Sequence, residues 1–128
     1  MGLREKRLIK TAQEELMPRY QSQLKSIIGH EIPLEAEWDS FVNDATALER
    51  LEDWVLQPLT KAFSKICVDQ LGKDAVKEGI KKIIFKNVAS SSDNQLFLHD
   101  GIVRITCAWG YGSYYSEDAI QESIERAL

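Results

Sequence analysis

Four side chains in this sequence have the chemistry for nucleophilic catalysis: the thiols of Cys67 and Cys107 and the imidazoles of His30 and His99. Such catalysis needs a thiol and its base within hydrogen-bond reach. His99 and Cys107 are close in sequence, but the strand register described below puts them on opposite faces of one hairpin. His30 is free to approach either thiol in three dimensions, although nothing in the sequence requires it. Neither cysteine has a CxxC partner or a flanking histidine, so we expect buried, inert thiols, no zinc site, no cofactor and no thiol enzyme.

Acidic side chains recur at alternate positions in one segment, at Glu31, Glu35, Glu37 and Asp39. On a strand these residues share a face, with neighbours about 6.5–7 Å apart. Such a row suits a basic protein partner, because charge complementarity guides association and specificity. A solvated face that protects an edge strand from aggregation is the structural alternative. Acid catalysis would need apolar surroundings that raise one pKa, and a metal site would need a turn that brings the oxygens together.

Four aromatic residues lie close together near the end of the chain: Trp109, Tyr111, Tyr114 and Tyr115. Tyrosine and tryptophan are common at binding surfaces, because they bury a large area and keep a polar tip. We expect Trp109 in the core and consider Tyr111, Tyr114 and Tyr115 as candidate contacts, with packing over the last helix as the alternative. The glycines of this loop lack the spacing of phosphate-binding loops.

The first part of the chain must supply helices and one strand. Apolar residues at helical spacing predict two long helices, and each contains a proline, Pro18 or Pro58, that either kinks or ends it. Between these helices, apolar and polar residues alternate strictly, which predicts a half-buried strand. Pro33 favours a position for this strand at a sheet edge. The predicted ranges are a helix from 8 to 28 stopped by Gly29, a strand from 31 to 39, a helix from 48 to 71 stopped by Gly72, and a helical turn from 73 to 78.

The second part of the chain is rich in predicted strands. A strand is expected at 82–88, and Asp100-Gly101 predicts a two-residue type I′ hairpin between strands at 95–99 and 102–109. In that register His99 faces Ile102, and Phe97 faces Arg104. The core face of the hairpin then carries Leu96, Leu98, Val103, Ile105, Cys107 and Trp109. A last helix, capped by Ser116, is expected to bury Ile120, Ile124, Ala127 and Leu128.

Composition narrows the functional classes. The 128 residues are 44% hydrophobic and 28% charged, which is ordinary for one globular domain spanning 1–128. The formal net charge of −4 disfavours nucleic-acid binding. The sequence has no secretory signal and no run of about 20 apolar residues, so we expect a cytoplasmic protein without a membrane partner.

These observations predict an α+β fold, with a small, mostly antiparallel sheet of about four strands and helices packed mainly on one face. The leading functional hypothesis is a non-enzymatic protein-interaction module, such as a small acidic inhibitor, an immunity-type protein or an adaptor, with a basic protein as partner. The alternatives are a small-molecule binding protein or minor enzyme with a pocket between sheet and helices, lined by Tyr111, Tyr114 and Trp109, and a subunit of a homo-oligomer. The candidate partner-binding residues are Glu35, Glu37, Asp39, Tyr111, Tyr114 and Tyr115.

Overall fold

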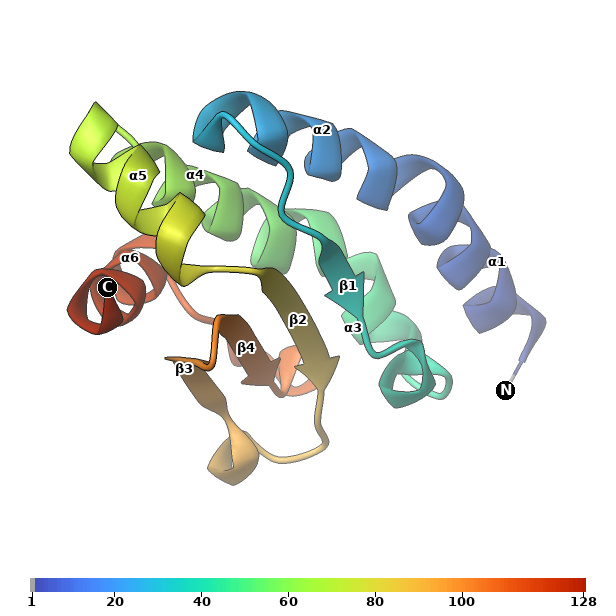
Figure 1. Ribbon diagram of the computed structural model, residues 1–128. Helices are drawn as coiled ribbons and strands as arrows, with labels where there is room; N and C mark the ends of the chain where they lie inside the picture. Colours follow the sequence, from blue (N-terminus) through green and yellow to red (C-terminus); the bar gives the residue numbers. More distant parts are fainter. Residues whose placement is uncertain (1) are drawn as a thin grey trace.

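A four-stranded sheet and a layer of helices make up the fold, in an α+β arrangement (Figure 1). The computed structural model describes residues 2–128. The elements are α1 (Leu3–Thr11), α2 (Met17–Ile28), β1 (Leu34–Ala36), α3 (Ala45–Glu49), α4 (Gln57–Ile66), α5 (Gln70–Gly79), β2 (Lys82–Asn87), β3 (Gln95–His99), β4 (Ile102–Cys107) and α6 (Glu117–Ala127).

The sheet is mixed and mostly parallel, so the predicted antiparallel sheet is wrong. Its strand order is β1-β2-β4-β3, and only the β3–β4 pair is antiparallel. β3 runs back from the end of β2 but forms no ladder with it, because β4 lies between the two. The apolar face of β4 carries Val103, Ile105 and Cys107, all buried, whereas the ends of β3, Gln95 and His99, are exposed. The more apolar strand therefore takes the central place.

Both internal prolines lie within continuing helices. The segment Ala12–Leu16 joins α1 to α2 as a π-helix, and Leu51–Leu56 does the same before α4. Pro18 and Pro58 stand in the first turn after these segments. A proline has no N–H to donate and its ring crowds the carbonyl one turn earlier, and the wider π turn relieves both conflicts. The first long helix ends where predicted, at Gly29, whose φ is 92°.

The second long helix ends earlier than predicted. α4 stops at Ile66, and α5 begins at Gln70 with Asp69 as its N-cap, since the Asp69 side chain accepts from Gly72 N. Gly72 therefore lies inside α5 and does not stop a helix. A Cβ at Gly72 would overlap the carbonyl oxygen of Ile66, so glycine is needed where the two helices meet. Leu71, expected in the core, is 80% exposed.

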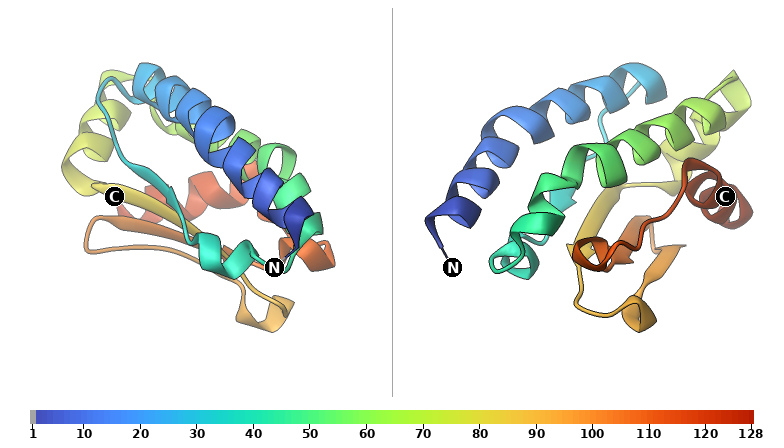
Figure 2. Two further views of the ribbon diagram at one scale, coloured as in Figure 1. Left: turned by 90° about the vertical axis from the view of Figure 1, so that its right-hand side faces the viewer. Right: turned by 180° about the vertical axis from the view of Figure 1, so that it is seen from behind.

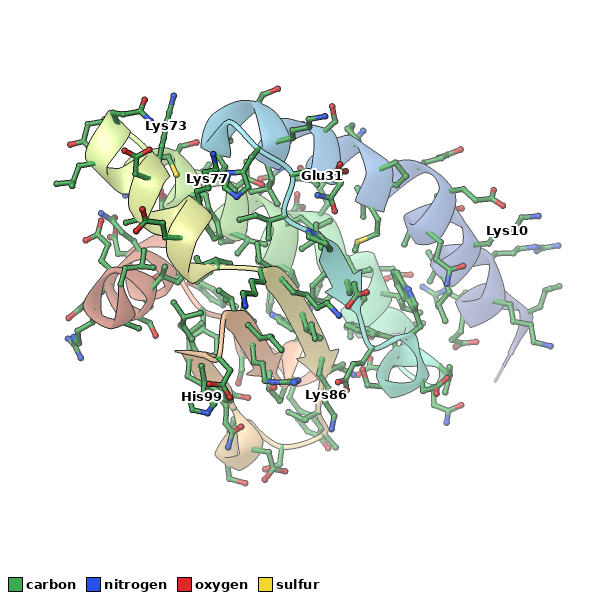
Figure 3. All side chains as sticks on the ribbon, in the orientation of Figure 1. Lys10, Glu31, Lys73, Lys77, Lys86 and His99 are labelled. Atoms are coloured by element: carbon green, nitrogen blue, oxygen red, sulfur yellow. The ribbon has the colours of Figure 1, made fainter. Side chains whose placement is uncertain are left out.

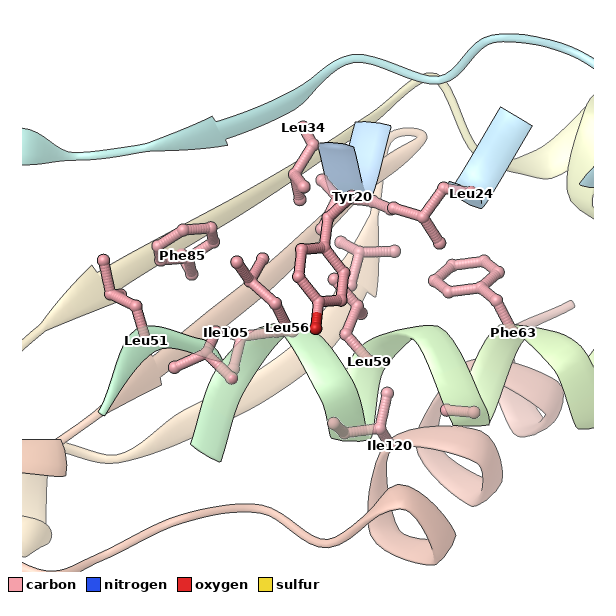
Figure 4. Close-up of a cluster of buried hydrophobic side chains, with 14 of the residues drawn as sticks. Tyr20, Leu24, Leu34, Leu51, Leu56, Leu59, Phe63, Phe85, Ile105 and Ile120 are labelled. Atoms are coloured by element: carbon pink, nitrogen blue, oxygen red, sulfur yellow. The ribbon is translucent and has the colours of Figure 1, made fainter. Parts of the chain in front are cut away.

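The core fills the space between the helices and one face of the sheet (Figure 4). Phe85 and Ile105 from adjacent strands pack there against residues of the long helices such as Leu56 and Leu59. Figure 2 shows in its left view that the long helices lie to one side of the strands. On the opposite face, Ile84 is half-buried and belongs to no buried cluster. The sheet is thus covered on one face only.

The C-terminal hairpin has the predicted turn and register, although β4 ends at Cys107, two residues earlier than predicted, and Trp109 begins a 3₁₀ turn. Asp100 and Gly101 have φ values of 52° and 79°, as a type I′ turn requires. The predicted register is confirmed, with His99 opposite Ile102. The Ser116 side chain accepts from Ala119 N and caps α6, as expected. At the other end of α6, Ala127 and Leu128 are exposed, so the prediction that they are buried is wrong.

A buried amide holds the carboxyl ends of β1 and β2 together. Asn87 is the last residue of β2, and its Nδ2 donates to Asp44 Oδ2 at 3.0 Å and to Ser40 O at 3.3 Å. Asp44 in turn caps α3 by accepting from Ala47 N at 3.0 Å. Within residues 2–128, Asn87 Oδ1 is buried without a hydrogen-bond partner. This network fixes the short 3₁₀ turn Trp38–Phe41 against the end of the sheet.

Candidate protein-binding surface

The acidic row lies along the edge strand of the sheet. β1 pairs only with β2, so it forms the predicted edge. The strand itself is shorter than the alternating pattern, because the 3₁₀ turn begins at Trp38. The alternation nevertheless persists, since Glu31, Glu35, Glu37 and Asp39 are all exposed. The predicted exposure of these carboxylates is confirmed, although only Glu35 lies within β1 and Asp39 lies in the 3₁₀ turn.

Two of these acids have cationic neighbours on β2. Lys82 Nζ lies 3.1 Å from Glu35 Oε2, and Lys86 Nζ lies 3.9 Å from Glu37 Oε2. All four side chains remain between 38% and 51% exposed. Exposed ion pairs contribute about 0–1 kcal/mol, so each carboxylate remains available to a further cation at little cost. Figure 3 shows Lys86 near the carboxyl end of β2.

A groove separates β1 from the first long helix. Its volume is about 570 Å³. The helix contributes Gln13 and Met17, which come from the π-helical segment and the turn that follows it. The sheet side contributes both carboxylates of the ion pairs and several apolar side chains. These groove-lining residues are Leu34, Glu35, Ala36, Glu37, Trp38 and Ile84.

Gln21 of α2 connects the first long helix to the edge strand. Its Nε2 donates to Ile32 O at 2.5 Å, and its Oε1 accepts from Leu34 N at 2.7 Å. The side-chain amide thus pairs with the backbone of β1 on the side away from β2. An unpaired strand edge is an aggregation hazard, and such a cap reduces it. No sequence pattern indicated this residue, because its partners are set by how the helix packs on the strand.

The aromatic loop divides between the core and the surface. Trp109 is 1% exposed and stacks on Phe41 with ring centroids 6.0 Å apart. Tyr111 and Tyr114 are 79% and 60% exposed, and Tyr115 is half-buried. The expected core position of Trp109 is confirmed. The three side chains predicted to line one pocket, Trp109, Tyr111 and Tyr114, therefore do not share one environment.

Tyr114 has an aromatic neighbour, Trp54, that the sequence analysis missed, and Arg50 lies over the ring of Trp54. The Tyr114 ring centroid lies 5.4 Å from that of Trp54, and Arg50 Cζ lies 4.1 Å from the Trp54 centroid. Arg50 also donates to Trp109 O at 2.5 Å, which fastens the loop to the second long helix. A notch of about 310 Å³ lies beside the Trp54–Tyr114 pair, lined by Asp53, Trp54, Pro58 and Tyr114. The four-residue spacing of Arg50 and Trp54 was the one available signal.

The thiols have the surroundings of structural cysteines. Cys67 and Cys107 are both buried and free. Burial raises the pKa of Cys67 above its ordinary value and that of Cys107 to about 11, so both stay protonated at neutral pH. Cys107 faces the core, whereas the His99 side chain is 75% exposed on the other face of the hairpin (Figure 3). The hairpin geometry therefore separates this thiol from this imidazole.

Across residues 2–128, no group of three or more His, Cys, Asp or Glu side chains is arranged to hold a metal ion. In the same range no helix combines the length and the apolar character needed to cross a membrane. Comparisons with known protein families, with curated proteins and with solved structures gave no match.

Proposed function

We propose that this chain is a non-enzymatic protein-interaction module that binds a basic protein, in the manner of a small inhibitor, an immunity-type protein or an adaptor. Its contact surface would centre on Glu35, Glu37 and Asp39. Net acidity of −4 favours encounter with a basic partner at long range.

The supporting observation is the position of the acids on an edge strand that borders a groove. Glu35 and Glu37 line the groove and are half-exposed. Their neighbours Lys82 and Lys86 lie on the β2 side only, so a partner can approach from the outer side of β1. A basic side chain placed there would complete an alternating row of charges, which stabilises neighbouring strands.

The exposed tyrosines supply a second patch for the same partner. The turn that contains Asp39 also contains Phe41, which stacks on Trp109 at the start of the aromatic loop. This contact links the end of the acidic row to the loop that carries Tyr111 and Tyr114. Exposed aromatic residues are common at protein interfaces.

Affinity capture from native cells tests this proposal. The wild-type chain is compared with a triple variant, Glu35→Gln, Glu37→Gln and Asp39→Asn. A second triple variant, Glu78→Gln, Glu122→Gln and Glu125→Gln, changes the net charge equally at exposed positions of α5 and α6. We expect the first triple variant, called the acidic triple variant, to bind the captured protein about tenfold or more weakly. The control variant should bind it with unchanged affinity.

The result is measured as a dissociation constant, with the captured protein purified and titrated by calorimetry. Equal affinity for the two triple variants would contradict the proposed contact surface. A captured protein that is itself acidic would contradict the proposed class of partner.

A further inference from the structure

The backbone of β1 has hydrogen-bonding groups on two sides. Toward β2, Pro33 O accepts from a β2 amide at 2.9 Å, and Glu37 N donates to a β2 carbonyl at 2.9 Å. Successive residues of a strand direct these groups to opposite sides. Those of Leu34 and Ala36 therefore point away from β2, toward the groove that both residues line.

Gln21 already occupies part of this outer side. Its amide donates to Ile32 O and accepts from Leu34 N, as one residue of an added parallel strand would. The fold thus holds a peptide-like amide on this edge. Past Gln21, Leu34 C=O and Ala36 N–H repeat the same acceptor and donor pattern. Among residues 2–128 these two groups have no hydrogen-bond partner.

The side chains on each face of β1 define what an added strand would carry. Glu35 and Glu37 lie on the uncovered face of the sheet, next to the lysines of β2. Leu34 and Ala36 lie on the helix side, where Met17 lines the groove. Directly opposite residues of neighbouring strands share a face. An added strand therefore fits best if basic residues alternate with apolar ones.

We infer that the outer edge of β1 binds an extended segment of a basic partner by strand addition, with Lys or Arg beside Glu35 and Glu37 and apolar residues toward Met17. Backbone hydrogen bonds to Leu34 and Ala36 give affinity in this mode, and the alternating side chains give specificity. The inference rests on the proposed function and adds its binding mode. A second copy of this chain is a poor occupant, because two β1 strands would bring like charges together.

Selection from phage-displayed random octapeptides, with the wild-type chain immobilised, tests the predicted pattern. Enriched peptides should alternate Lys or Arg with Val, Ile or Leu. Each enriched peptide is then synthesised with blocked ends and titrated against two variants. Ala36→Pro removes the outward N–H and no ladder bond to β2, whereas Ala36→Val keeps the N–H. We expect Ala36→Pro to weaken binding by about tenfold, as the loss of one backbone hydrogen bond implies, and Ala36→Val to bind normally.

Amide hydrogen exchange of the wild-type chain provides a reading that does not depend on how the proline variant folds. The Ala36 amide should exchange more slowly when the selected peptide is bound. No enriched peptide, unchanged exchange at Ala36, or equal binding by both variants would overturn strand addition.

The two proposals fail separately. Suppose that the protein captured from cells binds the Ala36→Pro variant normally but no longer binds the triple variant Glu35→Gln, Glu37→Gln and Asp39→Asn. The acidic contact surface then stands, and strand addition is wrong. If the selected peptides bind the Ala36→Pro variant more weakly but bind the acidic triple variant normally, strand addition stands and the proposed basic partner is wrong. Self-association through β1, detected by light scattering as a dimer that Ala36→Pro abolishes, would identify a second copy as the occupant and overturn the inference.

Discussion

At the scale of single residues, Cys107 links the core to the pH dependence of stability. Its side chain is fully buried beside the apolar residues of β4, and burial raises its pKa from an ordinary 9.0 to about 11. In the unfolded chain the thiol loses its proton near pH 9, but the folded chain keeps it. The unfolded state is therefore favoured as the pH rises through this window.

We expect the free energy of unfolding to fall by about 2 kcal/mol between pH 9 and pH 11 because of Cys107. Cys107→Ala should lose this part of the pH dependence, although its stability at neutral pH will be lower. The raised pKa values of Cys67 and Tyr20 contribute equally in both proteins, whereas the pKa of Tyr115 is raised by burial and in part by the charge of Cys107. The difference between the two proteins therefore reports Cys107 together with its effect on Tyr115. Urea denaturation at both pH values measures it, and parallel curves for the two proteins would contradict the expectation.

Residue patterns predicted some positions of the candidate protein-binding surface along β1 and missed others. Glu35, Glu37 and Asp39 were found because an exposed strand face has a period of two. Gln21 was not found, because a glutamine on a helix has no feature that distinguishes capping an edge from facing solvent. Its role depends on the helix lying beside β1, which is a property of the tertiary packing.

At the scale of elements, the side-chain amide of Gln21 stabilises the outer edge of β1. Gln21→Leu would leave the buried Leu34 N–H without its acceptor. We expect the free energy of unfolding to fall by about 1–3 kcal/mol, the usual cost of an unsatisfied buried donor. The matched control is Gln23→Leu, an exposed glutamine two positions along the same helix. Urea denaturation compares the two variants, and equal losses would show that Gln21 does not stabilise the edge.

Local signals predicted elements well where the chemistry was specific to one structure. Asp100-Gly101 fixed a hairpin and its register, because both residues tolerate a positive φ. Gly72 misled the prediction, because a glycine that allows two helices to touch has the same sequence appearance as one that ends a helix. The prolines left two outcomes open, and π turns placed just before them gave continuing helices.

At the scale of the whole molecule, one sheet face is covered and the other is not. Phe85 and Phe97 test this contrast, since Phe85 is fully buried and Phe97 is 37% exposed on the opposite face. We expect Phe85→Ala to lower the free energy of unfolding by about 3–5 kcal/mol, as for other large core residues. Phe97→Ala should cost less than about 1 kcal/mol, as at surface sites. Chemical denaturation of both variants measures this, and similar losses would mean that the second face is also covered.

The order of the strands could not be predicted from the sequence. Every strand from β2 onward was predicted near its observed place, and the α+β class was right. The pairing of β2 with β4 depends on contacts between distant residues, such as Ile83 with Val103. Neighbouring strands in sequence usually pair, but β2 pairs with β4 and not with β3, which makes the sheet mostly parallel.

The insertion of β4 between β2 and β3 also has a consequence for the order of folding. The hairpin joins residues close in sequence, such as His99 and Ile102, and hairpins form in about 1–10 μs. The pairing of Leu34 with Ile83 must close a far longer loop, which slows folding. We therefore expect the hairpin to form early and to offer β4 as the template on which β2 assembles, with β1 joining the sheet last.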